Sequence, residues 1–197
     1  MNNKDIKTQL DCIISIIKQN RDLMAILDYI ETLNLPNFYI AAGSIFQTVW
    51  NYYDNKPLNY GIKDIDIIYY DGKNLSKEKE QELEDNIQNF FTELGYNYKF
   101  DVHNEARMHL WKKENENKEI NQYKNSEDAI DKWIATVHAI GITKENEEIK
   151  VYAPYGLSDI FSRIIRPIKH KANSKELYDK KVSSWQKRFE NLNIIEW

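Results

Sequence analysis

Two aspartates separated by one residue, Asp64 and Asp66, have the spacing in this sequence that most favours chemistry. If their segment forms a strand, both side chains point to the same face of a sheet, because side chains alternate along a strand. Two carboxylates on one face repel each other unless a positive charge joins them. A divalent cation such as Mg²⁺ is commonly held by one or two carboxylates together with substrate phosphates. Asp101, which ends a later apolar segment, is the expected third member of this metal site.

A glycine and a serine, Gly43 and Ser44, stand between an apolar run and a helical pattern. Glycine lets the backbone approach a phosphate closely, serine adds a hydroxyl donor, and the first N–H groups of the helix attract anions. Phosphoryl or nucleotidyl transfer needs both halves of this arrangement, because its transition state is rich in negative oxygens that must be neutralised and positioned. The motif order therefore indicates Gly43 and Ser44 as nucleotide-binding residues and the three aspartates as catalytic metal ligands.

Hydrophobic periodicity predicts the elements that must position these residues. Predicted helices cover residues 6–33, 45–53, 76–94, 126–140, 157–164 and 175–189. Predicted strands cover residues 38–42, 64–70, 96–102 and 149–152, while 104–125 is ambiguous between turn, strand and short helix. Interleaved helices and few, short strands predict an α+β fold with a small mixed sheet. We expect one domain, residues 1–197, with a helical N-terminal segment (1–35), a catalytic core (about 36–115) and a helical C-terminal part (about 125–197).

The bulk composition excludes several classes of protein. The formal net charge of -4 demands no polyanionic partner over the whole surface. Cys12 is the only cysteine, which excludes a disulfide framework and a cysteine-rich zinc site. No apolar run reaches the roughly 18 residues needed to span a bilayer, so we expect a cytoplasmic protein without a membrane partner.

In combination, these motifs resemble the nucleotidyltransferase superfamily and, more narrowly, a bacterial nucleotidyltransferase-like family once catalogued as a domain of unknown function. The matching segments span nearly the whole chain and comprise residues 42–44, 49–51, 63–66, 104–111, 126–130, 152–157 and 166–167. The resemblance implies a polymerase-β-like core that binds a nucleoside triphosphate such as ATP with Mg²⁺ or Mn²⁺. The separation between Gly-Ser and Asp-x-Asp is longer here than in compact members of the superfamily.

Residues just beyond Asp101 are open to two interpretations. Asn104 and Arg107 could bind the nucleotide or the acceptor, because a guanidinium can clamp phosphate oxygens with two hydrogen bonds. Alternatively, they belong to a structural network in which Arg107 pairs with Glu105 or Asp128.

The second half of the chain offers further candidates. Trp50, Trp111, Trp133 and Trp185 could stack on a base, although core packing is the default role for each tryptophan. The basic stretch 169–188 could guide a nucleic acid or nucleotide, or form a solvated helix face, and the sequence favours Arg163 and Arg166 for reaching an active site. The sequence does not decide whether the acceptor of the nucleotide is a small molecule, a protein or an RNA. A catalytically inactive nucleotide-binding or partner-binding protein on the same fold is the alternative function.

Overall fold

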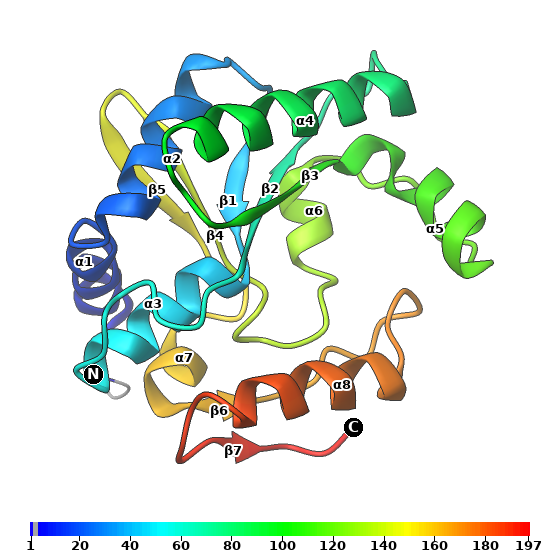
Figure 1. Ribbon diagram of the computed structural model, residues 1–197. Helices are drawn as coiled ribbons and strands as arrows, with labels where there is room; N and C mark the ends of the chain where they lie inside the picture. The colour runs from blue at the N-terminus through cyan, green and yellow to red at the C-terminus, as the bar shows by residue number, and fades with distance from the viewer. Residues whose placement is uncertain (2–3) are drawn as a thin grey trace.

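The computed structural model describes residue 1 and residues 4–197, and it forms a five-stranded mixed sheet with helices on both sides (Figure 1). The helices are α1 (Ile6–Ile17), α2 (Arg21–Thr32), α3 (Gly43–Tyr53), α4 (Lys77–Glu93), the 3₁₀ turn η1 (Glu105–Arg107), α5 (Met108–Glu116), α6 (Ser126–Ile130), α7 (Ser158–Ser162) and α8 (Lys175–Gln186). The strands are β1 (Tyr39–Ala41), β2 (Asp64–Tyr69), β3 (Lys99–Asn104), β4 (Gly141–Glu145), β5 (Glu148–Tyr152), β6 (Ile164–Ile165) and β7 (Asn193–Ile194).

The strand order of the main sheet is β3-β2-β1-β4-β5. β1 lies at the centre and runs antiparallel to both β2 and β4, whereas β2 and β3 are parallel. The pairing places Ala41, the last residue of β1, beside Asp66 of β2, and Asp66 beside Asp101 of β3. The turn that follows β1 and the predicted carboxylates therefore lie at the same level of the sheet.

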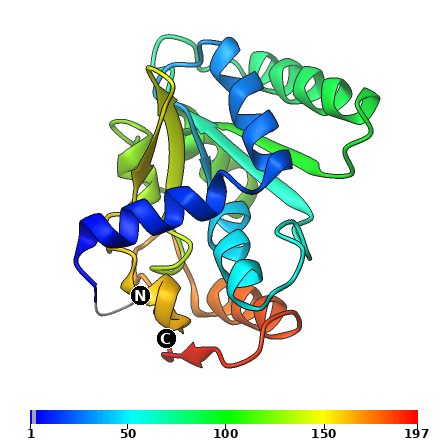
Figure 2. The same cartoon turned by 90° about the vertical axis from the view of Figure 1, so that its left-hand side faces the viewer.

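The two faces of the sheet have different partners. One face, which includes Ile40, Ile67 and Phe100, packs against α1, α2 and α4 in the main hydrophobic core. Figure 2 shows α1 and α2, in blue, lying across this side of the molecule. The opposite face has a smaller cluster built from Tyr39 and Ile68 with residues of α6 and the segment that follows it. Because side chains alternate along a strand, Asp66 and Asp101 lie on this second face.

Helix α4 covers the outer edge of β3 with hydrogen bonds as well as apolar contacts. Three side chains spaced four residues apart, those of Glu80, Glu84 and Gln88, line one face of the helix. They accept hydrogen bonds from every second backbone N–H of the edge strand. The bonds are Gln88 Oε1 to Phe100 N at 3.0 Å, Glu84 Oε2 to Val102 N at 2.9 Å and Glu80 Oε2 to Asn104 N at 2.6 Å. This arrangement satisfies an edge that would otherwise expose unpaired donors, and it fixes the strand that bears Asp101.

The structure confirms the predicted α+β fold and small mixed sheet, with one substantial error in the elements. The helix predicted over 126–140 ends at Ile130, and Gly141 begins β4 instead of ending a helix. A glycine is favoured at this position of β4, because a Cβ at Gly141 would meet side-chain atoms of Tyr39 and Ile130 at 3.0 to 3.1 Å. The ambiguous segment after Asn104 forms η1 and α5. None of the helices that the structure describes is long and apolar enough to cross a membrane.

Candidate active site

The three predicted aspartates meet at one place on the open face of the sheet. Asp66 and Asp101 are Cα partners on the parallel strands β2 and β3. Asp64 precedes Asp66 by two residues and therefore shares its face of β2. Asp64 is exposed, whereas Asp66 and Asp101 are partly buried. The structure thus places the three carboxylates that the sequence singled out on one face of two adjacent strands.

Asp66 has the most perturbed environment of the three. Its pKa is raised to about 7, mainly by burial and also by the negative charges of Asp64 and Asp101, against the opposing effect of Lys181 and Lys99. A buried carboxyl surrounded by like charges is costly to ionise without a compensating cation. Carboxylate oxygens are also the ligands that Mg²⁺ takes in proteins. The donor set therefore fits a hard divalent cation shared with a polyphosphate.

Asp101 is engaged in the structure by its neighbour on the same strand. Its carboxylate forms an ion pair with the ammonium of Lys99, whose side chain is 71% exposed. Within residue 1 and residues 4–197, no three His, Cys, Asp or Glu side chains are grouped as metal ligands. The pairing with Lys99 occupies Oδ1 of Asp101 and therefore competes with any cation for this carboxylate.

The turn from β1 into α3 has an unusual backbone. Ala42 adopts φ 56° and ψ -121°, a conformation that L residues rarely occupy. A side chain at Gly43 would place its Cβ 2.8 Å from Gln47 Nε2, so the glycine lets the Gln47 side chain lie close to the backbone of the turn. The N–H groups of Gly43 and Ser44 stand at the first positions of α3, where a helix offers no internal acceptor. The turn therefore presents backbone donors next to Asp66.

The side chains of this turn face inward. Ser44 is fully buried, and its hydroxyl donates to the carbonyl of Ala41 at 3.1 Å. Gln47, one helical turn later, donates to Gly43 O at 2.9 Å but leaves its buried Oε1 without a hydrogen-bond partner. The Ser44 hydroxyl thus holds the turn, and the unpaired Gln47 oxygen is a further polar group beside the turn that sequence reasoning missed.

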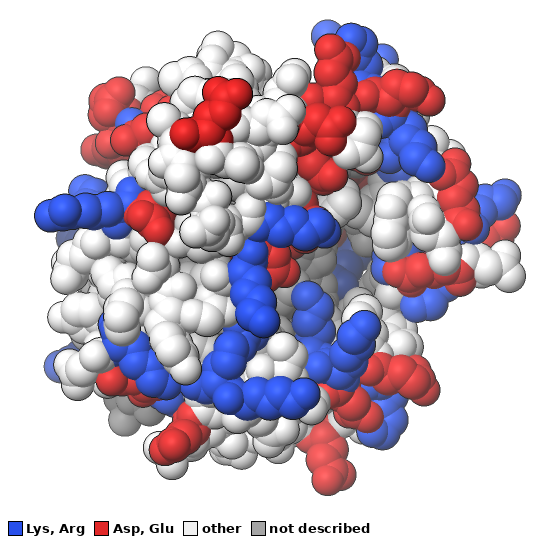
Figure 3. Space-filling view, viewed as in Figure 1, with Lys and Arg blue, Asp and Glu red and all other residues white. Residues whose placement is uncertain are grey.

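Basic side chains surround the carboxylates. Lys181 of α8 is partly buried, and its charge acts on both Asp66 and His138. It forms no hydrogen bond or ion pair with the part of the chain that the structure describes. Arg188 lies close enough to Asp64 for their charges to interact. Figure 3 shows Lys and Arg side chains gathered around a hollow in the middle of this face.

The structure gives the two arginines that the sequence favoured, Arg163 and Arg166, partners other than the three aspartates. Arg163 forms an ion pair with Asp54, and Arg166 forms one with Asp159 at 3.2 Å, so both are occupied away from the carboxylates. Lys181 could have been found from the buried stripe of α8, because it is adjacent to Val182 on the side of the helix that faces the molecule. The basic residues of 169–188 therefore do not all lie on a solvated helix face, because Lys181 is partly buried whereas Lys180 is exposed.

Asn104 and Arg107 belong to a buried network at the end of β3. The Asn104 side chain donates to the carbonyls of Asp71 and Asn74 at 3.0 and 2.8 Å and accepts from Asp71 N at 2.9 Å. Arg107 pairs with Glu80 at 2.6 Å, so its partner is neither of the acids expected from the sequence. Both side chains tie β3 to α4 and to the loop after β2, on the side of β3 opposite Asp101.

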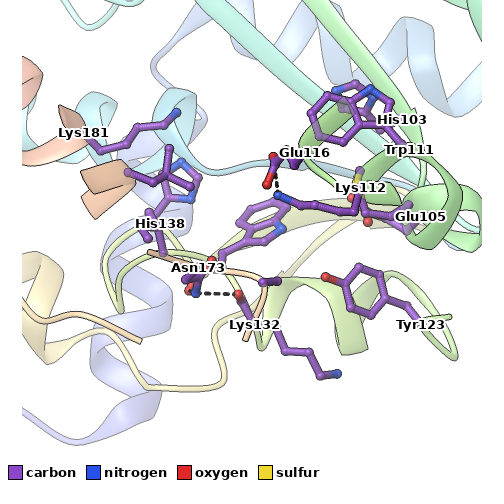
Figure 4. A pocket seen from close by; sticks show the side chains of 15 residues that line it. His103, Glu105, Trp111, Lys112, Glu116, Tyr123, Lys132, His138, Asn173 and Lys181 are labelled. Carbon is purple, nitrogen blue, oxygen red and sulfur yellow. Dashed lines mark hydrogen bonds and ion pairs between the residues drawn. The ribbon is translucent and has the colours of Figure 1, made fainter. Parts of the chain in front are cut away.

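A cavity of about 200 Å³ lies between α5 and α8. We call it the α5–α8 cavity. Figure 4 shows Trp111 and His103 on one side and His138 and Lys181 on the other. His103 follows Asp101 by two residues on the same face of β3. The cavity therefore adjoins the face of β3 that bears Asp101, although none of the three aspartates lines it.

Comparisons with known proteins agree with this geometry. A family model described as nucleotidyltransferase matches residues 28–194. A protein whose NMR structure is described as revealing a CCA-adding enzyme head domain superimposes with a TM-score of 0.80 and 28% sequence identity, covering 100% of this chain and 98% of the other. A search of curated proteins gave no match.

Proposed function

The chain belongs to this nucleotidyltransferase family, and from that premise we propose that it moves a nucleoside monophosphate from a nucleoside triphosphate to an acceptor, releasing pyrophosphate. The observation on which the proposal rests is the pairing of Asp66 with Asp101, beside the turn that contains Gly43. Carboxylates for a cation and backbone donors for a polyphosphate lie within one strand spacing of each other. The family and the fold support nucleotidyl transfer; the donor, the cation and the products are our proposal.

In the proposed reaction the acceptor oxygen forms a bond to the α-phosphorus. The bond between that phosphorus and the oxygen bridging to the β-phosphate breaks, and pyrophosphate leaves with the electron pair. The acceptor proton passes to the carboxylate of Asp101. The N–H groups of Gly43 and Ser44 hold the charged tail of the triphosphate, and the ammonium of Lys181 contacts the α-phosphate from the other side, because fixed donors stabilise developing charge without reorganisation.

A divalent cation would be held by Asp64 and Asp66, with Asp101 joining after release from Lys99. When bound, such an ion supplies charge neutralisation at the phosphates and favours deprotonation of the acceptor hydroxyl. For Asn104 and Arg107 we propose an indirect role in binding nucleotide, in which their network holds β3 and thereby the position of Asp101.

The test is a measurement of nucleotide binding and pyrophosphate release with each of the four triphosphates, in Mg²⁺ or Mn²⁺, with a small-molecule extract as the source of acceptors. Asp66→Asn should reduce pyrophosphate release at least a hundredfold, because a neutral amide is a poor ligand for a hard cation. Asp11→Asn is the matched control, since Asp11 is exposed on α1. Equal rates for Asp66→Asn and the wild-type protein would refute the proposal. Tight nucleotide binding without pyrophosphate release from any acceptor would favour the catalytically inactive alternative.

A further inference from the structure

We propose that the α5–α8 cavity is the acceptor site and that the acceptor is a small planar aromatic alcohol, not the end of a polynucleotide or a protein side chain. This inference rests on the proposed function and adds the class of acceptor to it. Four features of the cavity support the inference. They are its position relative to Asp66, its aromatic lining, its polar atoms without hydrogen-bond partners and its volume.

The position of the cavity follows the direction of the reaction. In phosphoryl and nucleotidyl transfer the attacking and leaving oxygens lie roughly in line through the phosphorus. The turn at Gly43 follows β1 on one side of Asp66, and Asp101 lies on β3 on its other side. If pyrophosphate leaves toward Gly43, the acceptor must approach from the side of Asp101. His103, the next residue on that face of β3, lines the cavity.

Aromatic side chains form a large part of the apolar lining, together with Met108, Ile134, Ala172 and Leu177. Trp111 comes from α5, Tyr123 and Trp133 come from the segments on either side of α6, and His103 comes from β3. Trp111 and Trp133 are partly exposed, unlike the core tryptophans Trp50 and Trp185. Aromatic rings prefer offset-stacked or edge-to-face contact with other rings. This lining therefore suits a planar ring system better than a flexible aliphatic chain.

Two polar groups in the cavity wall lack partners in the protein. Glu105 is 2% exposed, and its Oε2 has no hydrogen-bond partner. His138 also leaves its buried Nδ1 without one. Figure 4 shows the two residues on opposite sides of the cavity. Buried polar atoms without partners are rare in proteins, and here both line one cavity, so they can be satisfied by hydrogen-bonding groups at the edges of a ligand.

The size of the cavity limits the ligand. About 200 Å³ is below the roughly 300 to 1,000 Å³ of pockets for drug-sized ligands. The space accepts one ring system with a short substituent. A hydroxyl on that substituent would reach toward Asp101 past Lys181, whose charge acts on Asp66 from the cavity wall.

The inference can be tested by incubating the protein with Mg²⁺ and a mixture of labelled triphosphates, and with acceptors of three kinds. The first kind is an aromatic alcohol, either benzyl alcohol or 2-naphthylmethanol. The second is the straight-chain alcohol with the same number of carbons as each of these, and the third is a short RNA with a free 3′ hydroxyl. Mass spectrometry of the products should show nucleoside monophosphate adducts of the aromatic alcohols, formed at least tenfold faster than those of the other acceptors. Leu177→Trp, which fills the cavity from α8, and Trp111→Ala should each reduce adduct formation at least tenfold.

Matched variants and acceptors distinguish an acceptor site from a nucleobase site in the same cavity. Trp111→Phe should restore most of the adduct, because a ring is retained, whereas Tyr52→Ala on the exposed surface of α3 should have no effect. If Leu177→Trp weakens triphosphate binding as strongly as adduct formation, the cavity holds the nucleobase and the inference is wrong. It is also wrong if RNA is labelled and aromatic alcohols are not, although the proposed function would then stand. A failure to release pyrophosphate with every acceptor would instead refute the proposed function.

Discussion

Asp66 and Asp101 face each other across two neighbouring parallel strands, in register and on the same face of the sheet. Neighbouring strands lie about 4.8 Å apart, so one cation can contact both carboxylates without movement of the backbone. The ion pair between Asp101 and Lys99 competes with that contact. The sheet thus fixes the spacing of the carboxylates, and an exposed lysine competes for the second one.

We therefore predict that Lys99→Ala increases the affinity for divalent cations. An exposed ion pair contributes about 0.2 to 1 kcal/mol, which corresponds to at most about a fivefold change in the dissociation constant. Titration with Mn²⁺, followed by electron paramagnetic resonance, should show this gain at low ionic strength and a smaller gain at high salt. Lys150→Ala is the control, since Lys150 forms a comparable exposed pair with Glu148. Weaker Mn²⁺ binding in Lys99→Ala would contradict the competition.

Ala42→Gly should stabilise the protein. The positive φ of Ala42 costs about 1 to 3 kcal/mol, whereas glycine loses roughly 0.5 to 1 kcal/mol more conformational entropy on folding than alanine. The net gain in the free energy of unfolding should be about 1 kcal/mol, which raises Tm by roughly 2 to 4 °C. Calorimetry should show the opposite sign for Ala25→Gly in the interior of α2. A lower Tm for Ala42→Gly would show that the turn is not strained.

The sequence was sufficient to locate the carboxylates because their signal is local. An Asp-x-Asp in an apolar run fixes both the strand and the shared face of the two side chains, whatever the rest of the chain does. The helix predicted after Ser126 failed for the opposite reason. Ile130, Ile134 and Val137 have helical spacing, but they are buried against different partners, and the place of Gly141 beside Tyr39 depends on a strand about a hundred residues earlier.

The rest of the site depends on contacts between distant segments. The charge of Lys181 acts on Asp66 because Trp185 of α8 packs against Phe46 of α3 and against His138. These contacts join segments far apart in the chain, so sequence patterns do not predict them. Arg107 likewise pairs with Glu80, 27 residues away, and not with the acids that lie nearer to it in sequence. The sequence shows which residues are charged. Only the fold shows which of them lie near the three aspartates and which form ion pairs with other parts of the chain.

Glu80→Ala should be strongly destabilising. Glu80 is buried, accepts from Asn104 N and pairs with Arg107, whose side chain is 4% exposed. Removing one partner of a buried ion pair leaves an uncompensated charge and costs about 3 to 5 kcal/mol. Urea unfolding should show this loss, while Glu82→Ala, two residues away on the exposed surface of α4, should change the free energy of unfolding by less than about 0.5 kcal/mol. A similar result for both variants would mean that the network does not hold β3.

Glu105 should make stability fall as the pH rises. Burial raises its pKa to about 8, and the charges of Glu80 and Asp66 add to the effect, so folding opposes its ionisation. Because the folded-state pKa lies above the unfolded-state value of 4.5, the stabilisation is complete below pH 4.5 and is lost as the pH approaches 8. Each pKa unit corresponds to about 1.4 kcal/mol, and we expect a loss of roughly 2 to 3 kcal/mol between pH 5.5 and 8.5.

The measurement is urea unfolding of Glu105→Gln and the wild-type protein at both pH values. The variant cannot ionise at this position, so its stability relative to wild type should rise with pH by that amount. Glu114→Gln, on the exposed side of α5, should leave the pH dependence unchanged. Parallel stability profiles for Glu105→Gln and the wild-type protein would show that Glu105 titrates normally.

Lys181 and Lys180 are adjacent in α8 and allow a sharp test of how the triphosphate is held. Lys181 is partly buried and its charge acts on Asp66, whereas Lys180 is exposed. Lys181→Met retains most of the aliphatic stem but removes the charge, so we expect triphosphate binding to weaken about tenfold to a hundredfold, as for the loss of a charge-assisted hydrogen bond of roughly 1.5 to 3 kcal/mol. Lys180→Met changes the net charge equally and should change the dissociation constant less than twofold. Calorimetric titration with a triphosphate and Mg²⁺ measures both, and equal weakening would mean that only the overall charge of α8 matters.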